Sequence, residues 1–312
     1  MNWKRAIKEG IGISMQRLLK IAVLRADKKL TDSRMFLVKL RHRERFVLRN
    51  IQGSKMYLNV FDRGISTDLY FKGKRECLAT DEFQRRLKQK MVVVDIGANI
   101  GYFALMEAKA VGHDGKVYAI EPVDENIALL QKNVRINSYG NVELFNLAIG
   151  DKNGMREFIL SKYSNLGTFC EGLNLKSSGK RKPVLVQTLD SFLQNKRKPD
   201  FVRMDVEGFE FEVLHGMMKT LKEGSKMQLF IEVHADFMGQ KKTVEFFRLL
   251  KKAGVNKCRA IKESPDAFKF LEKILSKKVL PAQWVLDRSI DELVQDKVFH
   301  SGVYHLFAEK NG

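Results

Sequence analysis

The segment at residues 92–104 constrains the fold of this chain more than any other. It reads Val-Val-Val-Asp-Ile-Gly-Ala-Asn-Ile-Gly-Tyr-Phe-Ala, so three β-branched residues lead into an aspartate, two glycines and an apolar run. β-Branched residues favour strands, and apolar residues at helical spacing favour helices. The segment therefore predicts a strand that ends at Asp95, a tight glycine turn, and a helix over residues 100–111.

The glycine turn differs from a dinucleotide-binding turn, which would read G-x-G-x-x-G. The chain has Asn99 at the middle position, and asparagine tolerates a left-handed backbone. A carboxylate at the strand end would repel a pyrophosphate, but it suits a ligand with a cationic amino group. We therefore expect the turn to hold the amino acid portion of S-adenosylmethionine. The expected contacts are Asp95, Gly97, Asn99, Gly101 and Tyr102.

The next strand, predicted at residues 116–120, ends in Glu121-Pro122. A carboxylate at the tip of the second strand can accept hydrogen bonds from both ribose hydroxyls. Glu121 is therefore a second predicted contact of S-adenosylmethionine.

From residue 91 onward, strand-like and helix-like segments alternate, which predicts a doubly wound parallel sheet with ligands at the carboxyl ends of its strands. The expected strands are 91–95, 116–120, 142–147, 155–160, 184–188, 200–205, 227–233 and 303–308, and the expected helices are 100–111, 124–138, 209–222 and 241–253.

Acidic residues crowd the end of the strand at 200–205, where the chain reads Asp205-Val-Glu207-Gly208. Crowded carboxylates are unfavourable unless a cation lies nearby. That cation could be the sulfonium of the cofactor, Arg203 or a divalent metal. We predict that Asp205 and Glu207 are catalytic, whereas Glu210 is expected to stabilise the start of the next helix.

His234 ends the strand at 227–233 and lies on the same face as Glu232, because side chains alternate along a strand. Histidine titrates near neutrality, so we predict His234 as the general base for an acceptor oxygen. A metal held by Asp205, Glu232 and His234 stays an alternative, and we assign no metal ligand from the sequence.

Several of these motifs together resemble the FkbM family of S-adenosylmethionine-dependent methyltransferases. The matching segments are 95–102, 121–122, 146–151, 204–210 and 230–234, within a resemblance that spans roughly residues 53–239. It implies a class I methyltransferase fold: a Rossmann-like α/β architecture with a doubly wound, mostly parallel, seven-stranded sheet. It also implies that Asn146 and Ala148 contact the adenine, and that the acceptor is a small molecule, sugar or glycan.

The charge of the chain is uneven. Lysine and arginine number 56 against 37 acidic residues, and the first 50 residues contain 14 basic and four acidic ones. We predict a basic helical extension at residues 1–50, which could contact an anionic membrane. Nucleic acid is disfavoured, because the chain has no recognition module and little aromatic interleaving.

The remaining organisation follows from local patterns. Residues 51–90 predict a small β/α antechamber, with strands at 56–60 and 68–71 and a helix at 81–89. The methyltransferase domain follows at 91–312, with a helical insertion at about 262–300. We find no secretory signal and no apolar run of membrane-spanning length. We therefore expect a cytoplasmic protein, with peripheral contact at the inner membrane face as the alternative.

These patterns predict an S-adenosylmethionine-dependent methyltransferase that acts on an oxygen of a sugar, a glycan or another small hydroxyl or carboxyl acceptor. The sequence Asn/Asp-Pro-Pro-Tyr, typical of amino-directed methyltransferases, is absent. The alternatives are an adaptor that keeps the methyltransferase fold, or a methyltransferase directed to RNA or lipid by the basic N-terminus.

Overall fold

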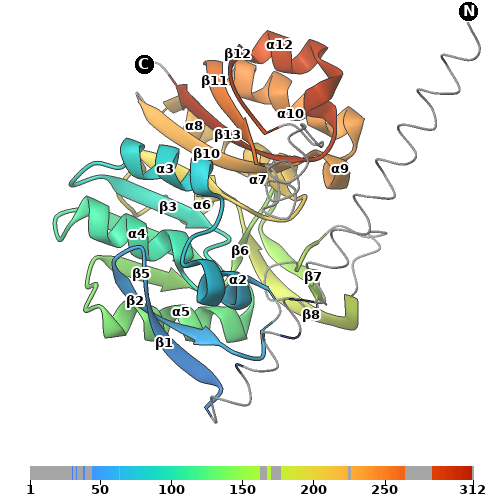
Figure 1. Ribbon diagram of the computed structural model, residues 1–312. Coiled ribbons are helices and arrows are strands. Elements are labelled where there is room, and N and C mark those ends of the chain that lie inside the picture. Colours follow the sequence, from blue (N-terminus) through green and yellow to red (C-terminus); the bar gives the residue numbers. More distant parts are fainter. Residues whose placement is uncertain are drawn as a thin grey trace, which may run out of the picture. The chain divides into compact units, whose positions relative to one another are not determined.

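The computed structural model describes residues 44–62, 64–161, 167–169, 177–223, 226–263 and 283–310, with three isolated positions at 30, 33 and 38 (Figure 1). The chain divides into two units. Residues 46–261 and 285–312 form the larger unit, and the account below concerns this unit. Most of the other unit, 1–45 with 262–284, lies outside the described residues, as do nearly all of the helices predicted at 1–50.

The larger unit is built on an eight-stranded sheet with the order β12-β11-β13-β10-β9-β3-β4-β5. The five strands from β10 to β5 are parallel neighbours, whereas β13 is antiparallel to both β10 and β11. The strands are β3 (Val92–Ile96), β4 (Lys116–Ile120), β5 (Val142–Phe145), β9 (Phe201–Met204), β10 (Met227–His234), β11 (Val255–Lys262), β12 (Trp284–Ser289) and β13 (Val303–Lys310). The predicted doubly wound, mostly parallel sheet is confirmed, with eight strands in place of seven.

Two of the predicted strands form outside this sheet. β7 (Gly154–Ser161) and β8 (Ser177–Gln187) pair in antiparallel fashion and, with β6 (Ala148–Ile149), make a separate three-stranded sheet. Its buried residues, Ala148, Phe158, Val184 and Val186, form their own small cluster. The long hairpin therefore stands beside the central sheet and does not extend it.

Helices cover both faces of the central sheet, because its side chains alternate between two apolar layers (Figure 1). α3 (Cys77–Arg86), α4 (Tyr102–Val111) and α5 (Asp124–Ile136) share a core with Val117 and Ala119 of β4. Tyr118, between those two, meets Phe192 on the opposite face. The helices after β8 are α6 (Leu189–Phe192), α7 (Glu210–Gly216), α8 (Met218–Glu223), α9 (Ala235–Met238), α10 (Gln240–Lys252) and α12 (Ile290–Gln295), with a 3₁₀ helix at Lys297–His300.

The segment before β3 packs into the same core as the sheet. β1 (Phe46–Ile51) and β2 (Ser54–Asn59) form a hairpin, so the predicted boundary at residue 50 falls inside a strand. The strand predicted at 68–71 is wrong: this stretch belongs to α2 (Ile65–Lys72). Ile65 and Leu69 are buried one helical turn apart, and the helix closes at Gly73, whose N–H donates to the carbonyl of Leu69 at 2.9 Å.

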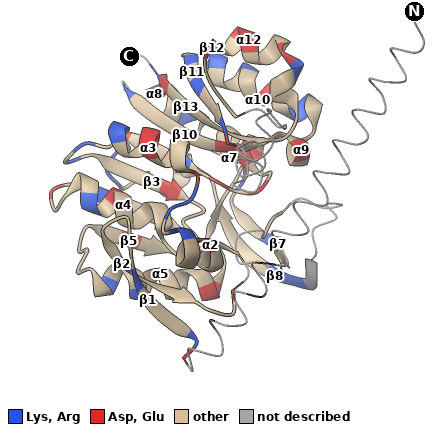
Figure 2. Ribbon diagram, viewed as in Figure 1, with Lys and Arg blue, Asp and Glu red and all other residues tan. Residues whose placement is uncertain are grey.

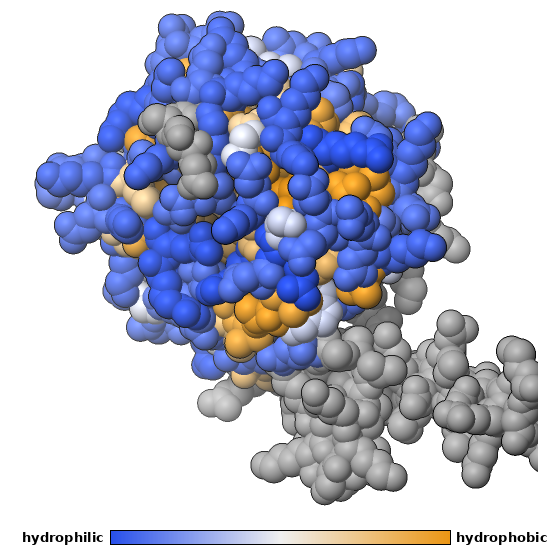
Figure 3. Space-filling view, turned by 90° about the horizontal axis from the view of Figure 1, so that it is seen from above, coloured by the Kyte–Doolittle hydropathy of each residue, from blue (hydrophilic) through white to orange (hydrophobic). Residues whose placement is uncertain are grey.

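The predicted helical insertion at 262–300 is only partly helical. Residues 284–289 form β12, residues 290–300 are helical, and 264–282 lie outside the described residues. Seen from above, the surface is mainly hydrophilic, with small hydrophobic areas between polar side chains (Figure 3). Among the described residues, no helix combines the length and apolarity that crossing a membrane requires.

Candidate active site

The glycine turn after β3 is held against the neighbouring strands. The backbone N–H groups of Gly97 and Ala98 both donate to the carbonyl of Ile120, at 2.9 and 3.0 Å. Gly97 has φ +84°, and a Cβ at this position would lie 2.0 Å from the carbonyl oxygen of Asp205. Only glycine fits so close an approach. Asn99 takes φ +50°, the left-handed conformation that the sequence predicts for it.

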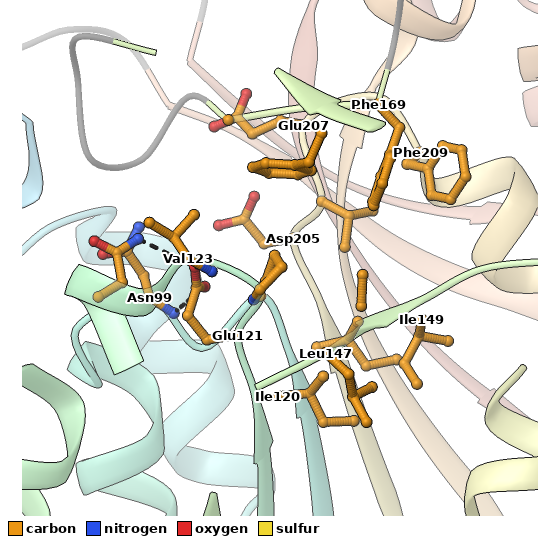
Figure 4. Close-up of a pocket in the computed structure, with 18 residues that line it drawn as sticks. Asn99, Ile120, Glu121, Val123, Leu147, Ile149, Phe169, Asp205, Glu207 and Phe209 are labelled. Carbon is orange, nitrogen blue, oxygen red and sulfur yellow. Dashed lines mark hydrogen bonds between the residues drawn. The ribbon is translucent and has the colours of Figure 1, made fainter. Parts of the chain in front are cut away.

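Glu121 sits at the tip of β4 and faces the glycine turn (Figure 4). Its carboxyl group accepts hydrogen bonds from the backbone N–H groups of Asn99 (2.9 Å) and Val123 (3.0 Å) and from Nδ2 of Asn126 (3.1 Å). Burial raises its pKa to about 7, although these hydrogen bonds act in the opposite direction. Glu121 therefore has the position that the sequence predicts.

A narrow cavity opens beside Glu121. Its wall is mostly apolar, with three phenylalanine rings, and Asp205 and Glu207 lie at another side of it (Figure 4). The apolar residues include Leu147, Ala148, Ile149, Phe158, Phe169 and Phe209. Ala148 is thus placed as expected. Asn146 is not part of the wall: its Nδ2 donates to the carbonyl of Glu121 at 3.1 Å and so supports the strand end.

Asp95 does not face this cavity. Its carboxyl group is fully buried, and its Oδ1 lies 2.8 Å from Nη1 of Arg203. Arg203 donates through Nη2 to Oδ2 of Asp205 at 2.9 Å, and its guanidinium packs 4.1 Å from the ring centre of Phe103. Asp95 therefore lines neither this cavity nor the one described next, and the direct contact with the cofactor expected of it stays a prediction. Asp95 positions Arg203, and through it Asp205.

A second cavity, of about 250 Å³, adjoins the first. Gly97, Asn99, Asp205 and Glu207 line both cavities, so the two meet at this edge of the sheet. More charged side chains line the second cavity than the first, and acidic residues gather where α7 begins beside β10 (Figure 2). Its charged and hydrogen-bonding wall residues include Arg75, Glu76, Tyr102, Arg203, Glu232 and His234.

His234 lines the second cavity and lies between three carboxyl groups. Its Nδ1 lies 2.8 Å from Oε1 of Glu210, whereas Nε2 lies 3.3 Å from Glu207 and 3.9 Å from Glu232. Burial lowers the pKa of His234, but the charges of Glu210 and Glu207 outweigh it and raise that pKa well above the ordinary value. The predicted trio of Asp205, Glu207 and His234 is therefore brought together.

Glu210 has a closer role at this site than the helix-start role expected of it. Its side chain is fully buried and fixes one nitrogen of the His234 ring. It also accepts the backbone N–H of Gly208 at 3.0 Å, which holds the turn that carries Glu207. Its position three residues after Glu207, at the first turn of a helix, explains why a capping role was the simpler expectation.

Three further side chains in or beside the second cavity were not predicted as site residues, namely Arg75, Glu76 and His305. His305 on β13 lies opposite Glu232 in the strand register, and its Nε2 lies 3.2 Å from Glu76. Burial raises the pKa of Glu76, but the hydrogen bond to His305 and the charge of Arg75 lower it to about 2. Position on a predicted strand was the only sequence signal for His305.

The geometry brings together two sets of potential metal ligands among the described residues. Within each set the ligand atoms lie within 4.8 Å of one another: Asp205, Glu207 and His234 form one, and Glu76, Glu232 and His305 form the other. The trio considered from the sequence, with Glu232 beside Asp205 and His234, is therefore divided between them.

Comparison with known proteins gives the site a context. A curated relative, a protein-L-isoaspartate O-methyltransferase from Methanococcoides burtonii, is 33% identical over 57 residues, which are 18% of this chain and 28% of that protein. The chain thus matches little more than a quarter of that relative's length. A S-adenosylmethionine-dependent methyltransferase structure from Aquifex aeolicus is 16% identical with a TM-score of 0.38, covering 74% of this chain and 89% of the other. An FkbM methyltransferase structure from Methylobacillus flagellatus is 17% identical with a TM-score of 0.33, covering 54% and 43%.

The family assignment rests on a different match. The methyltransferase FkbM domain matches residues 95–275, which is more than half of the chain and contains the glycine turn, Glu121, the Asp205 turn and His234. The cavity beside Glu121, with its carboxylate at the strand tip and its aromatic wall, suits the ribose and adenine of the predicted methyl donor. The chain belongs to the FkbM family of methyltransferases.

Proposed function

We propose that this methyltransferase acts on an oxygen of a small acceptor, a sugar or glycan hydroxyl in the first place, with a carboxyl group as the other acceptor of this class. The observation that carries the proposal is the junction of the two cavities. The first cavity, with its mostly apolar wall, ends at Asp205 and Glu207. The second cavity, large enough for part of a small acceptor, begins at the same two residues.

The residues of the first cavity fit the donor. Glu121 would accept the ribose hydroxyls, and Phe169, Phe209 and Ala148 would enclose the adenine. Gly97 and Asn99 of the turn line both cavities and would contact the amino acid portion. When bound, S-adenosylmethionine supplies an electrophilic methyl group on a sulfonium centre. Methyl transfer then depends on alignment of the acceptor oxygen with that methyl group.

The residues of the second cavity would align the acceptor. A hydroxyl loses its proton as it is methylated, so groups that bind the oxygen or take up the proton must face it. Asp205, Glu207 and His234 face this point from two neighbouring strands. Arg203 and Glu210, both buried, hold Asp205 and His234 in place. Catalysis is therefore assigned to a trio whose side chains are fixed before the acceptor enters.

The proposal is tested by the chemical stability of the product. Full-length protein would be incubated with methyl-labelled S-adenosylmethionine and panels of mono- and oligosaccharides, small carboxylic acids, amines and thiols. A methyl ether survives mild alkali, whereas a methyl ester is hydrolysed by it, and both count as O-methylation. Label recovered only as N-methyl or S-methyl product would overturn the proposal.

Variants assign the activity to the proposed site. His234→Asn should lower turnover by about 10²–10⁴-fold, the usual contribution of a positioned acid–base group, while donor binding persists. His215→Asn, at a histidine on α7 that lines neither cavity, should leave turnover unchanged. Equal turnover of both variants would remove His234 from the mechanism.

A further inference from the structure

The trio of Asp205, Glu207 and His234 has the composition and spacing of a cation site. One ligand atom from each lies within 4.8 Å of the others, and all three line the 250 Å³ cavity. Two carboxylates and one imidazole are a donor set that divalent first-row metals accept. The residues come from the end of β9, the turn after it and the end of β10, so parallel strands hold them in place.

The environment of His234 supplies a second, independent observation. Metal-bound histidines almost always donate the N–H of their other ring nitrogen to a carboxylate or carbonyl group, which turns the ligating nitrogen towards the metal. Here Glu210, which has no exposed side-chain surface, binds Nδ1 at 2.8 Å. Nε2 is thereby directed towards Glu207, at 3.3 Å. Glu210 is therefore placed as the outer partner of His234.

The local charges favour the same conclusion. Arg203 is the arginine bonded to Asp205, but it also pairs with the buried Asp95, so one cation serves two carboxylates. Glu207 and Glu210 add two more carboxyl groups around His234. The second set of potential ligands is less anionic, because Arg75 already lies 3.5 Å from Glu76.

We propose that Asp205, Glu207 and His234 bind one divalent cation of the Mn²⁺ class, with Glu210 as the outer partner of His234. Protein side chains would fill three positions, and the remaining positions would be open to oxygen atoms of the acceptor. This inference rests on the proposed function for its role and changes the part of His234 in it. A bound cation would hold the acceptor oxygen and lower its pKa, so His234 would act as a ligand of the cation and would not itself take up the proton. The binding itself does not depend on the identity of the acceptor.

The test measures metal binding directly. Full-length protein is freed of metals with a chelator and titrated with Mn²⁺ alone, and free Mn²⁺ is followed by its electron paramagnetic resonance signal. One equivalent should bind. Glu207→Gln should lose most of this binding, and Glu210→Gln should weaken it by about 10–100-fold, as outer partners of metal sites do.

A matched variant separates the two ligand sets. His305→Gln removes the imidazole of the other set and should leave the affinity for Mn²⁺ unchanged. Loss of binding in His305→Gln, with retention in Glu207→Gln, would overturn the assignment. Absence of Mn²⁺ binding to the wild-type protein would overturn it as well, provided that S-adenosylmethionine still binds and so shows that the protein is folded.

The outcome is distinguishable from failure of the proposed function. If methyl transfer to oxygen continues at full rate in excess chelator, the metal proposal fails and O-methylation stands. If Mn²⁺ binds at Glu207 and His234 but the product is not O-methylated, the metal site stands and the proposed acceptor class fails.

Discussion

Arg203 and Asp95 form a buried ion pair between two neighbouring strands of the central sheet, with Nη1 2.8 Å from Oδ1. The two residues lie opposite each other in the register of β9 and β3. Burial raises the pKa of Asp95, whereas the charge and hydrogen bond of Arg203 oppose that rise. The pair ties the strand that carries the glycine turn to the strand that carries Asp205.

Arg203→Met should therefore destabilise the protein strongly. Loss of one partner of a buried ion pair typically lowers the free energy of unfolding by about 3–5 kcal/mol, because the other charge stays buried without compensation. Urea unfolding would measure the change. Arg248→Met, at an exposed arginine paired with Glu245, should change stability by less than about 1 kcal/mol. Similar unfolding curves for the two variants would contradict this interpretation of the Arg203–Asp95 pair.

Gly97→Ala should weaken donor binding. A Cβ would meet the carbonyl oxygen of Asp205 at 2.0 Å and would also impose a positive φ on alanine, so the turn must shift. We expect at least a tenfold loss of affinity for S-adenosylmethionine, about 1.4 kcal/mol, by titration calorimetry. Gly140→Ala is the control, since its Cβ would have open space around it. Unchanged affinity of the Gly97 variant would show that the turn does not contact the donor.

Donor binding should strengthen as pH rises through 7. Burial raises the pKa of Glu121 to about 7, so the group is mostly protonated at pH 6 and mostly ionised at pH 8. Only the carboxylate accepts hydrogen bonds from both ribose hydroxyls, so affinity should rise by up to about tenfold over this range. The ligand 5′-methylthioadenosine lacks the titrating amino group and is the better probe. Glu121→Gln should bind 5′-methylthioadenosine weakly, and its affinity should not rise with pH. A rise of equal size in this variant would exclude Glu121 as the source of the pH dependence.

The buried, parallel part of the sheet was predictable because its strands are short apolar runs bounded by polar turns. β11 and β12, at one side of the sheet, were missed because both carry charged side chains among their apolar ones. β11 contains Lys257 and Arg259 between its buried residues, and β12 contains Asp287 and Arg288. Such patterns do not separate an edge strand from a loop. α2 was predicted as a strand because four residues are too few to distinguish the two periods.

Only those features of the site that follow from the position of a residue along its strand could be predicted from the sequence. Asp205, Glu207 and His234 follow two strands, and parallel neighbours bring such ends together. The pairing of Asp95 with Arg203, and of Glu232 with His305, depends on the register between strands. Register follows from tertiary packing, so the ion pair of Asp95 with Arg203 was not predicted and His305 was not found.

The basic N-terminus should bring the protein to anionic membranes at low ionic strength. Residues 1–50 carry a formal excess of ten positive charges, and each basic residue near an anionic surface contributes about 1 kcal/mol. Truncation at residue 50 would remove most of β1, so charge reversal in the full chain is the cleaner change. Co-sedimentation with anionic liposomes should fall at least tenfold for the triple glutamate variant of Lys4, Arg5 and Lys8.

The control for this experiment reverses three exposed lysines of the larger unit, namely Lys152, Lys241 and Lys257. It lowers the net charge by the same amount and should sediment like the wild-type protein. Equal losses in both variants would mean that net charge, and not the N-terminal segment, determines sedimentation.

Glu107, in the middle of α4, should lower the stability of the protein at neutral pH. Its side chain is fully buried, and neither carboxyl oxygen has a hydrogen-bond partner within the part of the chain that the structure describes. Burial, reinforced by the charge of Asp95, raises its pKa well above the ordinary value. The folded protein therefore holds Glu107 as a neutral acid, whereas the unfolded chain ionises it above about pH 4.3.

The sign of the pH dependence follows from these two states. Below the pKa that Glu107 has in the unfolded chain, the group is protonated in both states and costs no stability through ionisation. As pH rises from there towards the pKa of the folded state, only the unfolded chain releases the proton, so the free energy of unfolding falls. Glu107→Met removes this loss and the two unbonded oxygens, so it should raise the free energy of unfolding by about 1–3 kcal/mol at pH 8. The gain should be smaller at pH 5.5. Glu125→Met, at an exposed carboxylate on α5, should show no such gain at either pH. Equal stabilisation by Glu107→Met at both pH values would disprove the assignment of a neutral buried acid.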